Sequence, residues 1–332
     1  MTITPETTAP MATVATDPSE EAAMWASHLG KKFGEEIAVQ DVTFEIPHGK
    51  IFGFIGPSGC GKTTTVRLLT GVYEPTEGDV RVLGRHPMDF TQRVRARIGY
   101  MPQHFVLYPD LSVWENLNFA ASIYGVGLNR NETFNRLLEF VSLDEHKSKL
   151  VRNLSGGMQR RLSLAATLVH NPDLIFFDEP TTGIDPVLRR RFWDHFRELQ
   201  AEGRTLFVTT QYVGEAAYCD YVGLMDGGRL LMVETPEDLR RRAFGGEIVN
   251  LKTTDPLPYN QIIALRELPF SKSVDRVGDR QARLIVDDAG TAIPTLINWC
   301  QEQSITVEAV EEFLPPFDDV FVKIIEEEGN HA

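Results

Sequence analysis

A glycine-rich run around Cys60 has the composition of a loop that holds phosphate. It reads Gly56-Pro57-Ser58-Gly59-Cys60-Gly61-Lys62-Thr63 and matches G-x-x-x-x-G-K-[ST]. The apolar stretch Ile51–Ile55 precedes it and a helical stretch to Thr70 follows, which is the strand, loop and helix order that such a loop needs. Glycines let the backbone wrap an anion, amide groups at the helix start point at it, and Lys62 adds positive charge. The run therefore predicts a nucleotide phosphate site.

Each position of this loop has an expected role. We expect Thr63 to ligate Mg²⁺ through its hydroxyl. Cys60 fills a variable slot, and we interpret it as a small space-filler. The predicted nucleotide-binding residues here are Gly56, Pro57, Ser58, Gly59, Cys60, Gly61, Lys62, Thr63 and Thr64.

Two adjacent carboxylates follow a second apolar run, Leu174–Phe177. Such a run is typical of a central parallel strand buried on both faces, and sites in α/β proteins form at the carboxyl ends of these strands. We expect Asp178 to hold the Mg²⁺ shell and Glu179 to orient the water that attacks the γ-phosphate.

A third motif, Leu154-Ser155-Gly156-Gly157-Met158-Gln159, leads into an amphipathic helical stretch. Ser155 can cap that helix, and the capped end with its glycine amides forms an anion site. With the two earlier motifs, this run resembles the LSGGQ signature of ABC ATPases. Met158 stands where that family often has Gln, and Gln159 keeps an amide one position later. The resemblance covers about Trp25 to Met232.

The resemblance implies a cofactor, a dimer and further site residues. ATP is sandwiched between the phosphate loop of one subunit and the signature of the other, a homodimer being the simplest form. Gln103 matches the glutamine that touches Mg²⁺, and Asp185 matches the acidic loop that crosses the dimer interface. Phe33 sits where the family places an aromatic ring against adenine, although core packing and helix capping are the ordinary roles of Phe33 and Asp185.

The chain departs from the family pattern at Gln211. It follows the predicted strand Thr205–Thr210, where the family normally has a histidine on the γ-phosphate. An amide can donate to phosphate but cannot carry a proton near neutral pH. Some relatives similar to antibiotic-resistance exporters also have Gln here, so we expect activity to survive. The predicted catalytic residues are Lys62, Glu179 and Gln211.

The alternation of strands and helices from Trp25 to Arg242 predicts an α/β fold with a largely parallel sheet, a phosphate-loop NTPase core of the ABC type. Residues 1–24 lack a basic start and an apolar stretch, and we interpret them as a disordered tail. After Arg242 the pattern of predicted strands and helices changes. We therefore predict a small α+β accessory domain over 243–332, with a role in dimer support or regulation. A helical subdomain is expected over about 104–155.

The composition of the chain limits the kinds of partner that we expect it to bind. The net charge of −14 argues against nucleic acid, and three separated cysteines suggest neither disulfides nor zinc. No apolar run approaches the ~20 residues of a membrane helix. The resemblance implies a separate membrane permease whose short helix enters a groove of the helical subdomain, so we expect the protein on the cytoplasmic face of the plasma membrane. The candidate groove contacts are Phe105, Leu107, Tyr108 and Trp114.

Three classes remain open: an exporter subunit, an importer subunit, and a soluble ABC ATPase of translation or DNA repair. The single ATPase module, with no heptad array between Lys62 and Ser155, disfavours the soluble class. The α+β ending and the run Thr209-Thr210-Gln211-Tyr212 resemble the drug-resistance (daunorubicin-type) and lipid or polysaccharide export branch. We therefore favour export, with the cargo left undetermined.

Overall fold

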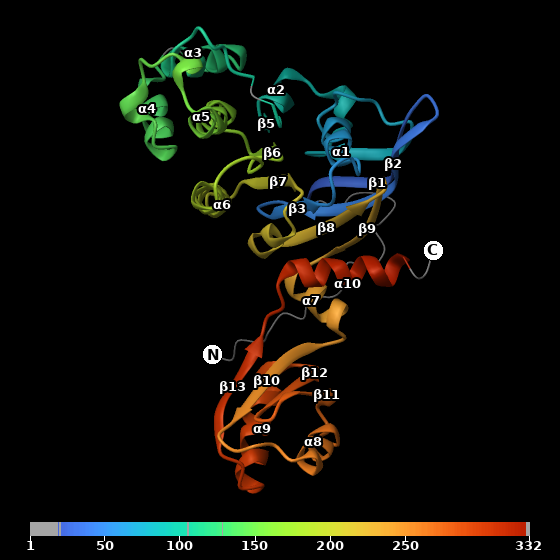
Figure 1. The fold of residues 1–332 in the computed structure, drawn as a ribbon. Helices are drawn as coiled ribbons and strands as arrows, with labels where there is room; N and C mark the ends of the chain where they lie inside the picture. Colours follow the sequence, from blue (N-terminus) through green and yellow to red (C-terminus); the bar gives the residue numbers. More distant parts are fainter. Residues whose placement is uncertain (1–18, 20, 105, 128, 330–332) are drawn as a thin grey trace, which may run out of the picture. The chain divides into compact units, whose positions relative to one another are not determined.

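The computed structural model describes residues 19, 21–104, 106–127 and 129–329. The chain divides into two compact units between Glu234 and Thr235 (Figure 1). The tail predicted for residues 1–24 falls mostly on residues 1–18 and 20, which lie outside the described part. Its predicted end is wrong, because Ala22 to Met24 already belong to a strand and Ala23 and Met24 are fully buried.

A six-stranded sheet forms the centre of the first unit, and it is parallel except for its last strand. Apolar residues fill both faces of β3 and β6, as a parallel sheet covered on two sides requires. In spatial order the strands are β5 (Ile98–Met101), β6 (Leu174–Asp178), β7 (Thr205–Thr210), β3 (Ile51–Ile55), β8 (Tyr221–Asp226) and β9 (Arg229–Glu234).

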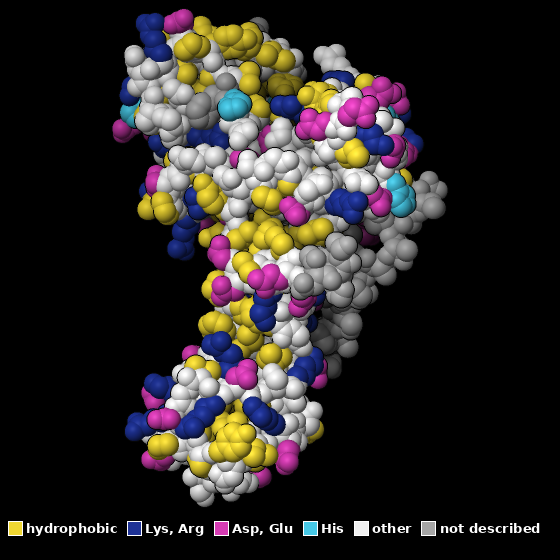
Figure 2. All heavy atoms as spheres, turned by 45° about the vertical axis from the view of Figure 1, so that its right-hand side comes forward, with side chains coloured by type: hydrophobic (Ala, Val, Ile, Leu, Met, Phe, Trp, Pro, Cys, Tyr) yellow, Lys and Arg dark blue, Asp and Glu magenta, His cyan; other side chains and the backbone are white. Residues whose placement is uncertain are grey.

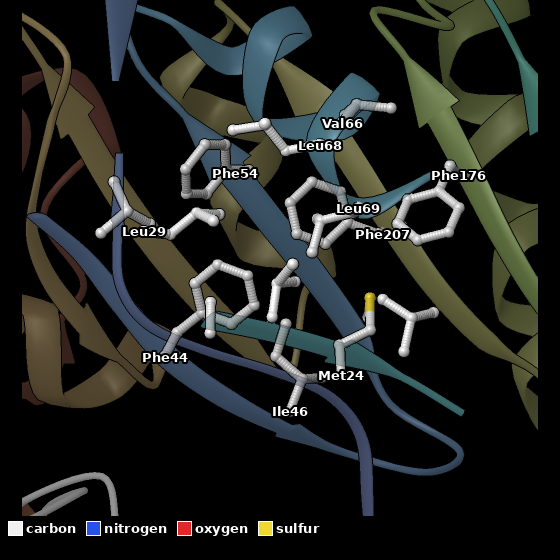
Figure 3. Close-up of a cluster of buried hydrophobic side chains, with 14 of the residues drawn as sticks. Met24, Leu29, Phe44, Ile46, Phe54, Val66, Leu68, Leu69, Phe176 and Phe207 are labelled. Carbon is white, nitrogen blue, oxygen red and sulfur yellow. The ribbon is translucent and has the colours of Figure 1, made fainter. Parts of the chain in front are cut away.

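An antiparallel sheet of three strands packs against this centre. Figure 3 shows buried side chains from its strands meeting Phe54, Phe176 and Phe207 of the six-stranded sheet, with Leu68 and Leu69 of the first helix beside them. The strands are β2 (Glu36–Pro47), β1 (Ala22–Phe33) and β4 (Glu77–Val82). The core thus holds the strand that ends in the phosphate loop and the helix that begins there in fixed positions.

Helices α3, α4 and α5 lie together, apart from the antiparallel sheet (Figure 1). Helices α3 and α4 lie within the region 104–155, where a helical subdomain was expected, and the Ser112 and Glu115 side chains cap α3 reciprocally. The helices of this unit are α1 (Lys62–Leu69), α2 (Gln92–Arg95), α3 (Val113–Ile123), α4 (Asn131–Phe140), α5 (Gly156–Leu168) and α6 (Pro186–Ala201).

Short 3₁₀ turns among the described residues join these elements: η1 (Pro87–Asp89), η2 (Asp144–His146), η3 (Val151–Asn153) and η4 (Val213–Tyr218). Within the described residues, no helix combines the length and the apolar character that crossing a membrane takes.

The second unit is an α+β domain around a four-stranded antiparallel sheet of order β11-β12-β10-β13. Its strand and helix order is the βαββαβ arrangement of ferredoxin-like folds. The elements are α7 (Pro236–Phe244), β10 (Glu247–Thr253), α8 (Tyr259–Arg266), β11 (Ser271–Gly278), β12 (Gln281–Val286), α9 (Ala289–Glu302), β13 (Val307–Phe313) and α10 (Phe317–Gly329).

The division between the units comes earlier in the chain than the predicted boundary at Arg242. Residues 235–242 belong to the second unit because α7 packs against α10. The Arg240 guanidinium lies 4.0 Å from the ring centroid of Phe317, and Lys323 lies over the ring of Phe244 at 4.3 Å. Contacts between residues this distant in sequence leave no local signal at which to place a boundary.

Candidate nucleotide site

The loop Gly56–Gly61 joins β3 to α1, which begins at Lys62, as predicted. Gly61 has φ 105°, a left-handed conformation that side-chain-bearing residues rarely adopt. A Cβ atom on Gly56 would lie 2.0 Å from the carbonyl oxygen of Met225, so only glycine fits there. The loop therefore folds tightly, so that its backbone amides can approach a bound phosphate.

Lys62 lies inside the curve of this loop, with only 3% of its surface exposed. Its Nζ atom donates hydrogen bonds to the carbonyl oxygens of Gly56 and Pro57, both at 2.9 Å. The same atom lies 3.5 Å from Oε1 of Glu179. One buried cation is thus shared between the loop and the predicted water-orienting carboxylate.

Asp178 ends β6 beside the hydroxyl of Thr63. Its Oδ1 atom accepts hydrogen bonds from Thr63 Oγ1 at 3.0 Å and from Thr209 Oγ1 at 2.7 Å. Burial raises the pKa of the Asp178 carboxyl, and these two hydrogen bonds oppose that rise. A carboxylate and a hydroxyl oxygen side by side are hard oxygen donors of the kind that Mg²⁺ prefers, so the pair fits the predicted ion.

Glu179 follows with its backbone in the left-handed region, at φ 49°. Its amide donates to the backbone oxygen of Thr209 at 3.1 Å. Its Oε2 atom accepts hydrogen bonds from Gln103 Nε2 at 3.0 Å and from Thr182 Oγ1 at 3.1 Å. The structure therefore brings Gln103, Lys62 and Glu179 together, although they come from three separate parts of the chain.

The signature turn begins α5. Ser155 is its N-cap, and its hydroxyl accepts a hydrogen bond from the Met158 amide at 3.3 Å. Gly156 is exposed, and a Cβ atom there would meet nothing within 4 Å. Gln159 was expected to contribute its side-chain amide to the anion site. Its side-chain nitrogen Nε2 instead donates to the carbonyl oxygens of Val151 and Leu154, both at 3.3 Å. That side chain braces the preceding loop instead of extending the anion site.

Three further predicted residues are Phe33, Asp185 and Cys60. Phe33 is 42% exposed at the end of β1, with its ring edge-on to Tyr73 at 5.2 Å. Asp185 caps α6 by accepting from the amides of Val187 and Leu188, both at 3.0 Å. Cys60 is buried, and burial raises the pKa of its thiol, which agrees with its interpretation as a space-filler.

Sequence reasoning missed three residues of the site. Thr182 and Thr209 bind the two carboxylates through their hydroxyls. Arg160 is buried and donates to backbone oxygens around Glu179. None of them had a local signal, since Arg160 stands beside Arg161 in a helix that also contains Ser163 and Thr167.

A groove of about 680 Å³ lies between the helical region and the edge of the six-stranded sheet. Figure 2 shows hydrophobic side chains gathered over the helical region. Of the predicted contacts, Leu107 and Tyr108 line the groove and Phe105 lies outside the described residues. The prediction for Trp114 is wrong: its ring packs edge-on against buried Phe134, at 5.0 Å.

Comparison with known proteins identifies the family. Residues 39–182 match the family model described as ABC transporter. The chain is 37% identical over 236 residues to the Nod factor export ATP-binding protein I of Cupriavidus pinatubonensis, an alignment that covers 70% of this chain and 73% of that protein. The chain belongs to the ABC transporter family.

Other relatives of this ABC ATPase carry related names. It is 34% identical over 253 residues to the linearmycin resistance ATP-binding protein LnrL of Bacillus subtilis, covering 75% of this chain and 80% of that one. It is 40% identical over 228 residues to the probable multidrug ABC transporter ATP-binding protein YbhF of Escherichia coli. That match covers 68% of this chain but spans only 39% of the relative's length.

Solved structures agree with the fold. An ATP-binding subunit of an ABC transporter superposes with a TM-score of 0.62 at 28% identity, covering 67% of this chain and 93% of that one. A dimeric ATP-binding cassette in a post-hydrolysis state, bound to ADP and Pi, has a TM-score of 0.58 at 26% identity and covers 64% and 98%. The predicted fold class is confirmed, and the chain carries an ABC ATPase domain.

Gln211 follows β7, whose Thr210 carbonyl oxygen accepts a hydrogen bond from the Gly56 amide at 3.3 Å. Gln211 itself is exposed. We expect Gln211→Ala to lower turnover by about 10- to 100-fold, because it removes the donor that the family resemblance places on the γ-phosphate. ATP affinity should persist. Steady-state hydrolysis and nucleotide titration measure the two, and unchanged hydrolysis would remove Gln211 from the mechanism.

Proposed function

We propose that this chain is the ATP-hydrolysing subunit of an exporter, working as a dimer that encloses two ATP molecules. The observation that carries the proposal is the buried cluster in which Lys62, Asp178 and Glu179 meet at the phosphate loop. The likeness to a dimeric cassette bound to ADP and Pi supports the nucleotide and the dimer. The names of the relatives, which speak of multidrug transport, Nod factor export and linearmycin resistance, favour export over import.

The residues divide the chemistry of phosphoryl transfer between them. Amide groups of the loop and the Lys62 ammonium bind the β- and γ-phosphates and offset their charge. Thr63 and Asp178 would hold Mg²⁺, with Gln103 beside them, and the ion would neutralise charge on the phosphate oxygens. Glu179 aligns a water molecule for attack on the γ-phosphorus and accepts its proton.

The signature of the second copy would complete each site. In this proposal the amides of Gly156 and Gly157 and the Ser155 hydroxyl donate to the γ-phosphate held by the opposite phosphate loop. Binding of ATP then favours the closed dimer, and loss of the γ-phosphate contacts after hydrolysis releases it. Asp185, with Phe33 against adenine, lies at the margin of the same interface.

A membrane subunit would use this cycle, with the ATPase at the cytoplasmic face of the membrane. The proposed docking site is the apolar groove of the helical region, which suits a short amphipathic helix. Its lining includes Val106, Leu107, Tyr108, Phe119, Ile123 and Tyr124. The test of the whole proposal is Mg²⁺-dependent ATP hydrolysis by the full-length chain, purified alone and with a membrane protein encoded beside it.

The groove can be tested at Tyr108, which is 45% exposed and rests edge-on against Phe119 at 4.5 Å. We expect Tyr108→Asp to abolish co-purification with the membrane subunit, because a carboxylate would be buried without a partner. The free energy of unfolding should change by less than about 1 kcal/mol, as for other surface positions. Met88→Asp, at 46% exposure and outside the groove, is the control. Undiminished co-purification of the Tyr108 variant counts against docking here.

A further inference from the structure

Arg160 connects three segments of the nucleotide site through their backbones. Its side chain is buried, with 3% of the residue exposed. Nε donates to the carbonyl oxygen of Pro180 at 2.8 Å, and one terminal nitrogen donates to that of Gln103 at 2.6 Å. The other terminal nitrogen donates to the carbonyl oxygen of Glu179. A planar guanidinium can bind carbonyls in several directions at once, which a lysine ammonium on a flexible stem cannot reproduce.

These contacts bear on the direction of the Glu179 side chain. A residue other than glycine in the left-handed region is strained and persists only where its surroundings hold it. Here Thr209 holds the amide of Glu179 and Arg160 holds its carbonyl group. Without the guanidinium, the carbonyl oxygen of Glu179 would keep only the Thr182 amide, at 3.3 Å, so the turn would hold the carboxylate less firmly in line with Lys62.

Arg160 also belongs to the helix that begins with the signature turn. It lies one turn beyond Ser155, the N-cap of α5, on the same rigid element. A shift of the signature turn therefore moves the guanidinium, and the guanidinium moves the carbonyl groups of Gln103 and Glu179. One side chain connects the anion site at the start of α5 with the water-orienting residue of the same chain.

We propose that Arg160 is a positioning residue that couples the two ATP sites of the dimer. The inference rests on the proposed function, in which the signature of one copy serves the nucleotide of the other. Closure of a signature turn on the partner's γ-phosphate would then set Glu179 in its own chain. The coupling is reciprocal, so misplacement of Glu179 also loosens the signature turn.

Mixed dimers of full-length chains test this directly. One copy carries Glu179→Gln, so that a single site hydrolyses ATP. Arg160→Gln is then placed in one of two positions. It is either in the copy with the intact Glu179, or in the Glu179→Gln copy, whose signature turn completes the working site. We expect turnover to fall about 10- to 100-fold in both arrangements, as small misplacements do, with ATP affinity changed less than about twofold. Arg160→Lys should recover part of the loss in both.

Arg161→Gln is the matched control. Its guanidinium also donates to backbone oxygens, those of Val141 and Ser142 at 2.9 Å, but these lie away from the phosphate loop. It should leave turnover within about twofold in either arrangement. Thermal unfolding identifies any variant that fails to fold, and Arg160→Lys then decides in its place.

If turnover falls in only one arrangement, or in neither, the coupling is overturned. An Arg160 that acted on a single ATP site would lower turnover from only one of the two copies. An equal loss in the Arg161 control overturns it as well. If dimers carrying Glu179→Gln never form with ATP, the proposed function itself fails, and that outcome is seen before Arg160 is changed.

Discussion

Glu179→Gln is expected to lower ATP turnover by about 100- to 10,000-fold, the usual contribution of a general base. The amide has the shape of the carboxylate and can still accept from Gln103 Nε2 and Thr182 Oγ1. It lacks the negative charge that polarises water and takes its proton. ATP should stay bound and unhydrolysed, and the dimer should accumulate.

Three measurements check this expectation: phosphate release with Mg²⁺, nucleotide titration, and light scattering with ATP. Glu198→Gln is the control, because it removes an exposed carboxylate of α6 whose partner is His195. Retained hydrolysis in the Glu179 variant would show that another group orients the water. A variant that binds ATP but stays monomeric, alone and with its membrane subunit, would contradict the enclosed-nucleotide dimer.

Gly156→Asp is expected to separate nucleotide binding from dimer formation. A Cβ atom at Gly156 meets nothing within 4 Å, and an acidic side chain in the first turn of a helix is favourable for the helix itself. The single chain should therefore fold and bind ATP normally. In the dimer the new carboxylate would face the γ-phosphate of the opposite subunit and replace attraction with repulsion, so turnover should fall at least about 100-fold.

Gly127→Asp provides the comparison, since a Cβ atom there also meets nothing within 4 Å and the residue follows α3 and is not part of the signature turn. It should hydrolyse ATP like the unchanged protein. Nucleotide titration, light scattering of the Glu179→Gln form with ATP, and phosphate release report the three steps separately. Full activity of the Gly156 variant would exclude a role for this turn in the opposite site.

Much of the fold and of the site could be predicted because the motifs impose local demands on the backbone. Glycines at the positions of Gly56 and Gly61, an apolar strand before them and Lys62 after them define a phosphate loop wherever it lies. The strand that ends in Asp178 and the cap at Ser155 are local in the same sense. The role of Gln103 came only from the family resemblance.

What the tertiary structure decided is which distant residues meet. Gln103 and Glu179 come within hydrogen-bonding distance because β5 and β6 are neighbours in the sheet, a matter of strand order that no local pattern encodes. The adjacent arginines Arg160 and Arg161 look alike in sequence, and only packing turns the first toward Glu179 and the second toward Val141. Local motifs specify chemistry, whereas long-range packing specifies which of these groups are close enough to act on one another.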